Sequence, residues 1–218
     1  LEYDRYENQH TEIFDLENSD RAFEEEVMLG GFGNAEVKPE GSGVVYEQAQ
    51  ETFTARYSHE TIALAFSLTE EAVEDNLYDK ISTRYTKALA RSMANTKQIK
   101  AANVLNRAFN SSFLGGDDKE LCATDHPTLS GTQKNELSTA ADLNETSLEQ
   151  MLIDIADMKD ERGMKIALRG MKMIIPVNLQ FVAERLMKSA GRVGTADNDL
   201  NAVRSMGMVP QGYVVNNF

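Results

Sequence analysis

The feature that most constrains this chain is a stretch from Gln48 to Leu114 that contains neither glycine nor proline. From Thr69 onward its apolar residues recur at helical spacing, and Ser67-Leu-Thr-Glu70 matches a capping box that opens a helix. A continuous helix from Thr69 to Phe109 would be about 60 Å long. This is longer than a domain of this size needs to cross its own core. The alternative is two helices separated near Asn95-Thr96.

A long β-hairpin is predicted before this helix. Apolar residues alternate with polar ones from Phe53 to Tyr57 and again from Ile62 to Phe66, which is the period of a strand. The apolar face changes parity between the two runs, so we expect the strand to bulge or twist near residues 58–60. We expect Ala35–Lys38 and Val44–Tyr46 to form the returning strand. Such a hairpin needs another surface, because an isolated one is marginally stable in water.

Charge is concentrated at the start of the chain. The 218 residues carry a net charge of −13, which argues against a protein that binds nucleic acid by neutralising phosphates. Residues 1–26 hold ten acidic and two basic residues, a net charge of −8. With so few apolar residues this segment cannot fold alone, and we interpret it as an arm that orders on another surface. The alternative is a disordered acidic tail.

The second half of the chain mixes helices and strands, which predicts an α+β fold. Residues 110–146 are polar and rich in turns. Helical spacing and a capping-box match at Thr146-Ser-Leu-Glu149 predict a helix that Gly163 ends. The remaining expected elements are buried strands at Lys165–Leu168 and Met173–Ile175, a helix from Asn178 to Lys188, a helix at Leu200–Ser205 capped within Asp197-Asn-Asp199, and a strand at Tyr213–Val215.

Residues that could support catalysis are few. Cys122-Ala-Thr-Asp125-His126 could supply a nucleophile and a base, so a hydrolase using Asp125 and His126 is one hypothesis. The favoured interpretation is structural, because Asp-His-Pro is an ordinary turn sequence. A single cysteine leaves no cluster for a metal, and no apolar run is long enough for a membrane span. We therefore expect no catalytic, cofactor or metal site, and no membrane partner.

The arm, the hairpin and the over-long helix all leave surface that one chain does not cover. These features favour a subunit that neighbouring copies complete. Six segments carry a family resemblance in their joint order: Gly31–Gly41, Arg56–Thr61, Glu74–Lys80, Ala101–Phe109, Ala123–Pro127 and Arg192–Asp199. With them the chain resembles the major capsid proteins of tailed bacteriophages that have the Hong Kong 97 type of fold, and among these the Mu-like prophage major head subunits.

The resemblance implies four regions: an N-terminal arm at 1–32, an extended hairpin called the E-loop at 33–66, a peripheral domain with its spine helix at 67–116, and an axial domain at 117–218. Family members continue further, so the resemblance implies a chain that is incomplete at its C-terminus. The start at Leu1 rather than at methionine also predicts a fragment or a processed product. Some members cross-link lysine to asparagine between subunits. Lys38 lies in the E-loop, but no motif here supports that chemistry.

The resemblance further implies an icosahedral shell of hexamers and pentamers that encloses double-stranded DNA without sequence-specific binding. Assembly would take place in the bacterial cytoplasm, with portal, scaffold and decoration proteins as further partners. A nanocompartment shell of the same fold is an alternative. The residues expected at subunit interfaces belong to the arm and the E-loop: Phe14, Phe23, Val37, Lys38, Glu40, Tyr46, Phe53, Arg56 and Tyr57.

Overall fold

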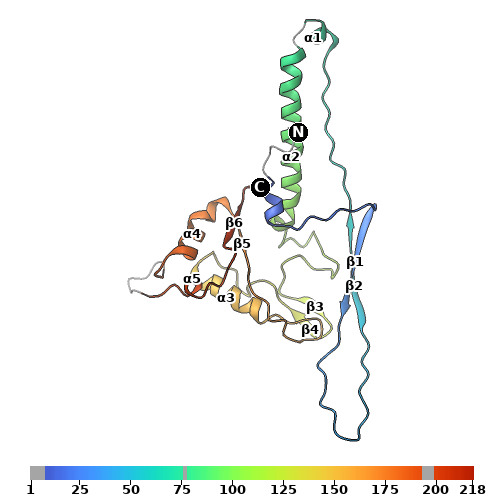
Figure 1. Ribbon diagram of the computed structural model, residues 1–218, viewed down its shortest axis with the longest axis vertical. Coiled ribbons are helices and arrows are strands. Elements are labelled where there is room, and N and C mark those ends of the chain that lie inside the picture. The colour runs from blue at the N-terminus through green and yellow to red at the C-terminus, as the bar shows by residue number, and fades with distance from the viewer. Residues whose placement is uncertain (1–7, 76–77, 193–198) are drawn as a thin grey trace. The chain divides into compact units, whose positions relative to one another are not determined.

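The computed structural model describes residues 8–75, 78–192 and 199–218, without the side chains of 72 and 78–81 (Figure 1). It combines helices and strands, as the sequence predicts. The chain divides into two compact units. One contains residues up to Ala22, Ser58–Asn106 and Phe218, and the other contains Phe23–Tyr57 and Arg107–Asn217.

The first unit is built on one long helix, α2 (Tyr78–Asn106), of 29 residues, which is about 44 Å at the standard rise. A short helix, α1 (Glu70–Glu74), precedes it. Helix α2 is continuous through Asn95-Thr96, so the alternative of two helices separated there is wrong. The long helix is confirmed with a shorter extent, because it ends at Asn106 and α1 is a separate element. The intervening Asn76 and Leu77 lie outside the described residues.

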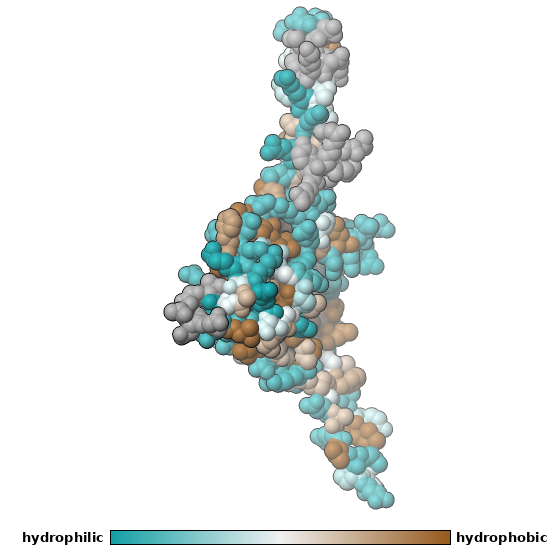
Figure 2. Space-filling model, turned by 60° about the vertical axis from the view of Figure 1, so that its left-hand side comes forward, coloured by the Kyte–Doolittle hydropathy of each residue, from teal (hydrophilic) through white to brown (hydrophobic). Residues whose placement is uncertain are grey.

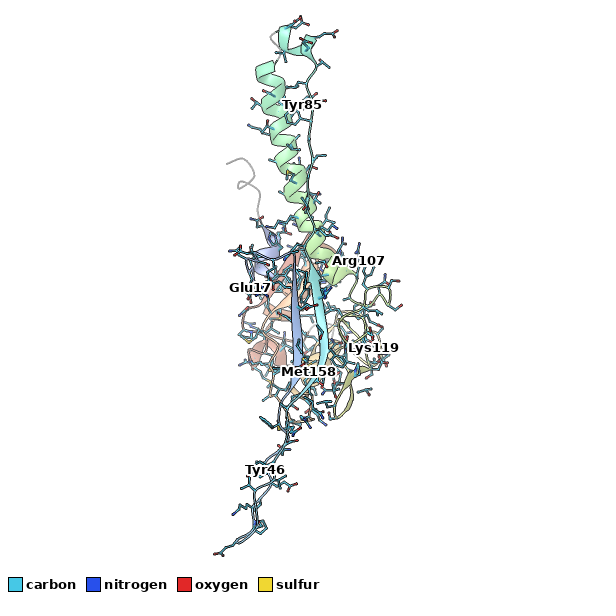
Figure 3. All side chains as sticks on the ribbon, turned by 90° about the vertical axis from the view of Figure 1, so that its right-hand side faces the viewer. Glu17, Tyr46, Tyr85, Arg107, Lys119 and Met158 are labelled. Carbon is cyan, nitrogen blue, oxygen red and sulfur yellow. The ribbon has the colours of Figure 1, made fainter. Side chains whose placement is uncertain are left out.

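An extended segment, residues 59–69, runs antiparallel to α2. The Lys100 ammonium lies 2.5 Å from a Glu60 carboxylate oxygen, and the rings of Phe66 and Tyr85 meet edge to face at 5.7 Å. Figure 3 labels Tyr85 on α2. The 15 helical residues between Tyr85 and Lys100 rise by about 22 Å, close to the span of about 20 Å of six extended residues. The predicted strand over Ile62–Phe66 is wrong, because packing on a helix leaves this segment without a strand partner.

Part of the acidic arm folds onto the same helix. A 3-10 turn, η2 (Gln9–Glu12), places His10 at 5% exposure. The backbone N–H of His10 donates to the Gln98 side-chain oxygen at 3.0 Å, and Gln98 in turn donates to Asn8 Oδ1 at 3.2 Å. Gln98 lies between the buried Ala94 and Ala102 on one face of α2, since residues four apart share a face. Small side chains on this face let the arm approach the helix closely.

The second unit begins with a two-stranded sheet of β1 (Phe23–Gly30) and β2 (Gln50–Ser58). A hairpin does precede the long helix, but of the segments predicted to form it only Phe53–Tyr57 lies in a strand, within β2. The segments Ala35–Lys38 and Val44–Tyr46 are not strands. The strand that pairs with β2 is β1, which contains three consecutive glutamates of the acidic stretch, residues 24–26. The expected bulge at 58–60 is absent, because β2 ends at Ser58.

A small antiparallel hairpin follows, formed by β3 (His126–Thr128) and β4 (Gly131–Gln133). Helix α3 (Glu145–Ala156) comes next, and its cap differs from the predicted one. Asn144 accepts a hydrogen bond from Ser147 N, and the Ser147 hydroxyl accepts one from Asn144 N. This is a capping box two residues before the predicted one. The helix ends at Ala156, well before Gly163.

The rest of this unit is a crossover between two parallel strands, β5 (Met173–Pro176) and β6 (Tyr213–Asn216). The connection contains the 3-10 turn η3 (Val177–Leu179), α4 (Gln180–Lys188) and α5 (Ala202–Ser205). The strands near 173 and 213 and the helix near 180 are confirmed. The strand at Lys165–Leu168 is wrong, because this segment is exposed and has only a single bridge.

The core of this unit is small and lies between α3 and α5. It comprises the buried Leu148, Leu152, Val203 and Val209, with methionines 173, 187 and 208 packed around them. Asn201, at 2% exposure, ties the core elements together. Its amide donates to the carbonyls of Leu186 and Ser189 at 2.7 and 3.1 Å, and its oxygen accepts from Arg204 N. One side chain thus ends α4 and caps α5. The predicted cap at Asp197-Asn-Asp199 is wrong for Asp199, while Asp197 and Asn198 lie outside the described residues.

Candidate assembly surfaces

The loop between β1 and β2, residues 31–49, exposes apolar side chains to solvent (Figure 2). Val37 is 94% exposed, Tyr46 93% and Val45 71%. The two sides of the loop separate around a cleft of about 470 Å³. Beyond Gly33 and Glu47, no hydrogen bond joins the two sides within the described residues, apart from the turn at Pro39–Ser42. Folding of this chain alone therefore leaves the loop's apolar surface uncovered.

The base of this loop is held by one side chain from elsewhere in the same unit. Arg162 Nε donates to the carbonyl of Gly31 at 3.1 Å, and a terminal nitrogen of Arg162 donates to the carbonyl of Gln48 at 3.0 Å. Its other terminal nitrogen lies 3.4 Å from a Glu47 carboxylate oxygen. The second oxygen of Glu47 accepts from Gly33 N at 2.8 Å. The guanidinium thus bridges both sides of the loop where the β1–β2 pairing ends.

A tight turn presents Arg162. Asp160 Oδ1 accepts from the backbone N–H groups of Arg162 and Met164 at 2.9 and 2.8 Å. Gly163 adopts φ +86°, a left-handed conformation that glycine reaches without strain. The turn is braced on the β3–β4 hairpin, because Gln133 donates to the Asp160 carbonyl at 2.9 Å. Side-chain atoms of Arg162 are only 19% exposed.

Two glycines allow the β1–β2 hairpin to lie close to its surroundings. A Cβ on Gly30 would stand 2.6 Å from Leu129 Cδ1, and one on Gly116 would stand 3.1 Å from the backbone of Thr54 and Ala55. The second contact involves β2 backbone, which moves less easily than the end of a side chain. The hairpin is therefore packed at its strands and clamped at the base of its loop, while the rest of the loop is uncovered.

Several residues expected at interfaces make contacts within their own chain. Arg56 forms an ion pair with Glu25 and lies 4.5 Å from the centre of the Phe23 ring. Phe53 is half-buried on β2, and Phe14 is half-buried beside the η2 turn. By contrast, the loop residues Val37, Lys38, Glu40 and Tyr46 are exposed, and Tyr57 is 55% exposed. Figure 3 labels Tyr46 on the extended part of the loop.

The pair Asp125/His126 is not brought together. His126 Nδ1 is hydrogen-bonded to Asp117 Oδ2 at 2.6 Å, and Asp125 pairs with Lys119. Partial burial raises the pKa of Asp117, but hydrogen bonds from His126 and from the backbone N–H of Lys119 outweigh it and lower that pKa overall. Burial raises the pKa of the Cys122 thiol, with the Glu136 charge adding to the effect, which disfavours the reactive thiolate.

Among the described residues, no hydroxyl or thiol is hydrogen-bonded to His126, and its Nε2 is buried without a partner. No group of three or more histidine, cysteine or acidic side chains is suited to hold a metal in the described part of the chain. Within these same ranges, no helix combines the length and the apolar character needed to cross a membrane.

Comparison with known proteins shows the family to which the chain belongs. The profile of a family described as "Phage capsid protein" matches residues 51–218. The chain belongs to this phage capsid protein family. A search of curated proteins gave no significant match.

Two solved capsid structures have a similar fold. The capsid of bacteriophage JBD30 superposes with a TM-score of 0.66 at 12% sequence identity, covering 92% of this chain and 86% of that one. The JBD30 capsid decorated with minor capsid protein trimers gives a TM-score of 0.65, also at 12% identity, with coverages of 91% and 86%. At this identity the likeness concerns the fold.

This capsid protein is therefore a structural protein, a major capsid subunit of a phage virion, and not an enzyme. Neither the hydrolase nor the nanocompartment alternative finds support. Sequence reasoning missed Arg162 and Glu47, which shape the base of the loop. Asp160-Glu-Arg-Gly163 does have a turn signal, with Asp first and Gly fourth. That signal predicts a turn but does not reveal which distant segment its arginine binds.

Proposed function

We propose that this capsid protein builds a closed icosahedral shell of the Hong Kong 97 type, arranged as hexamers and pentamers around double-stranded phage DNA. The hairpin loop would act as the E-loop and lie, together with the acidic arm, against neighbouring copies. Portal, scaffold and decoration proteins are the further partners we expect, and assembly would take place in the cytoplasm of the bacterial host.

The observation that carries this proposal is the uncovered loop. Val37, Val45 and Tyr46 are each more than two-thirds exposed on a loop whose base is fixed by Arg162. Exposed apolar groups gathered on one surface mark an interaction site. Stable subunit contacts bury large areas, and a projecting loop adds such area without enlarging the core.

The net charge of −13 also fits a shell around DNA. An acidic subunit repels phosphate rather than trapping it. The arm can make contacts both within and between subunits. Residues 8–12 pack on α2 of their own chain, while the acidic side chains between this turn and β1 are exposed and available to a neighbour. The individual interface residues on the loop and arm are part of this proposal.

Electron microscopy of the purified protein tests it. We expect closed shells from the wild type and none from a double variant, Val37→Ser with Tyr46→Ser. A matched control, Asn34→Ser with Glu36→Gln, changes two exposed residues of the same loop without removing apolar surface and should still assemble. A wild type that stays a monodisperse monomer at every concentration and salt would refute the shell. Normal shells from the Val37/Tyr46 variant would refute the role of the loop.

A further inference from the structure

We propose that Arg162 is the positioning residue of the hairpin loop: its guanidinium sets the direction in which residues 33–46 leave the subunit. The inference rests on the proposed function of the loop. It goes beyond that function by naming the group that controls the loop from outside it.

Arg162 binds the loop where the pairing of β1 and β2 ends. Strand β1 ends at Gly30 and β2 begins at Gln50, so the carbonyls of Gly31 and Gln48 lie just outside the paired strands. Arg162 donates to both, at 3.1 and 3.0 Å. The planar fork of a guanidinium can serve two acceptors at fixed separation, which a single ammonium does less well. Arg162 therefore fixes the spacing of the two sides as they enter the loop.

The carboxylate of Glu47 orients the guanidinium of Arg162. Glu47 pairs with Arg162 through one oxygen and accepts from Gly33 N through the other. A Cβ on Gly33 would stand 3.2 Å from the Glu47 carboxylate, so the absence of a side chain there lets the carboxylate come close. Glu47 thus relays the hold of Arg162 across the loop to Gly33.

Arg162 joins a firmly held turn to a loop that has little support of its own. On the Arg162 side, Asp160 and the β3–β4 hairpin hold the turn through several hydrogen bonds. On the loop side, residues 34–38 and 43–46, all within the described part of the chain, form no hydrogen bond with one another, and a cleft separates them. Because the turn is held firmly and the loop has no support of its own, the contacts of Arg162 set the direction of the loop.

The test replaces Arg162 by Met, which keeps an unbranched apolar stem and removes the fork, and measures folding, loop exchange and assembly. We expect an unfolding midpoint close to the wild type's. Amide hydrogen exchange at Gly33, whose N–H donates to the Glu47 carboxylate that Arg162 holds, should become roughly tenfold faster, with little change in the α3–α5 core. Shells should be absent or irregular. Arg162→Lys should restore only part of the loop protection, because the effect depends on the fork and not on charge alone.

Arg169→Met is the matched control, because among the described residues Arg169 donates to one carbonyl, that of Gly207, at 2.8 Å. It should leave loop exchange unchanged. Unchanged loop exchange in Arg162→Met, or regular shells in normal yield, would overturn the positioning role. If Arg162→Met does not fold, Arg162→Lys and Glu47→Gln give the same readouts.

Different experiments would contradict the proposed function of the loop and the positioning role of Arg162. Shells formed by the Val37/Tyr46 double variant would remove the loop's role in assembly, while the loop exchange of Arg162→Met would still report the clamp.

Discussion

The α3–α5 core and the hairpin loop belong to the same compact unit, yet they place apolar side chains in opposite environments. Leu148, Leu152 and Val203 are at most 8% exposed, whereas Val37 and Tyr46 are more than 90% exposed. Burial of apolar area stabilises a fold by roughly 25 cal/mol per Å², and the loop obtains none of this within one chain. The comparison separates residues that determine whether the subunit folds from residues that are available to neighbours.

The largest expected effect is in the core. Leu152→Ala removes a buried side chain on α3 and should lower the free energy of unfolding by about 2–5 kcal/mol, the range for such cavities. Ile153→Ala is the matched control on the same helix, because Ile153 is 55% exposed. Chemical denaturation of the unassembled protein measures both. Equal losses for the two variants would contradict the assignment of the core.

A second core prediction concerns a polar residue. Asn201→Ala leaves the carbonyls of Leu186 and Ser189 and the N–H of Arg204 without their side-chain partner. We expect a loss of about 1–3 kcal/mol, the penalty for buried polar groups left unsatisfied. Asn34→Ala, at an exposed loop position, should be near neutral in the same denaturation experiment. A neutral Asn201→Ala would mean that the ends of α4 and α5 do not depend on this side chain.

The elements that could be predicted from the sequence are those that depend on local periodicity. The long helix, the β2 strand and the strands at 173 and 213 follow from local periodicity, which the fold did not override. The return strand was misplaced because alternation at Ala35–Lys38 is no stronger than the acidic run of β1, and pairing is a long-range choice. The segment around Ile62–Phe66 has strand spacing but pairs with no strand; its Phe66 ring meets Tyr85 of α2 instead, and period alone does not distinguish a helix from a strand as the neighbour.

The loop's exposed residues were predictable in kind, since Val37 and Tyr46 lie near turn glycines. The clamp was not, because Arg162 and Gly31 are 131 positions apart and no local pattern links them. The same holds for His126, whose partner is Asp117 and not the adjacent Asp125. Adjacent side chains in a strand point to opposite faces, so neighbours in sequence are often not neighbours in contact.

The Asp117–His126 pair, in the same compact unit as the core and the loop, should make stability depend on pH. The folded-state pKa of Asp117 is lowered, so its ionised form adds stability above the unfolded pKa of about 3.9. That stability is lost as pH falls through the lower folded-state pKa. Asp117→Asn should therefore be less stable than the wild type near neutral pH, with the difference shrinking in acid. Asp125→Asn should change stability less, because its pair with Lys119 is more exposed. A difference for Asp117→Asn that grows on acidification would contradict this sign.

The smallest effect on folding is expected in the loop, and it completes the comparison. Tyr46→Ser removes an aromatic side chain that is 93% exposed, so the unfolding free energy of the unassembled subunit should change by less than about 0.5 kcal/mol. Phe53→Ser is the contrasting variant, because Phe53 is half-buried on β2 and its loss removes packing within the chain. We expect Phe53→Ser to lower both stability and assembly, and Tyr46→Ser to lower assembly alone. Denaturation paired with light scattering distinguishes the two. If Tyr46→Ser destabilises the subunit as much as Phe53→Ser does, the loop is part of the folded core in solution and the two regions do not differ as described.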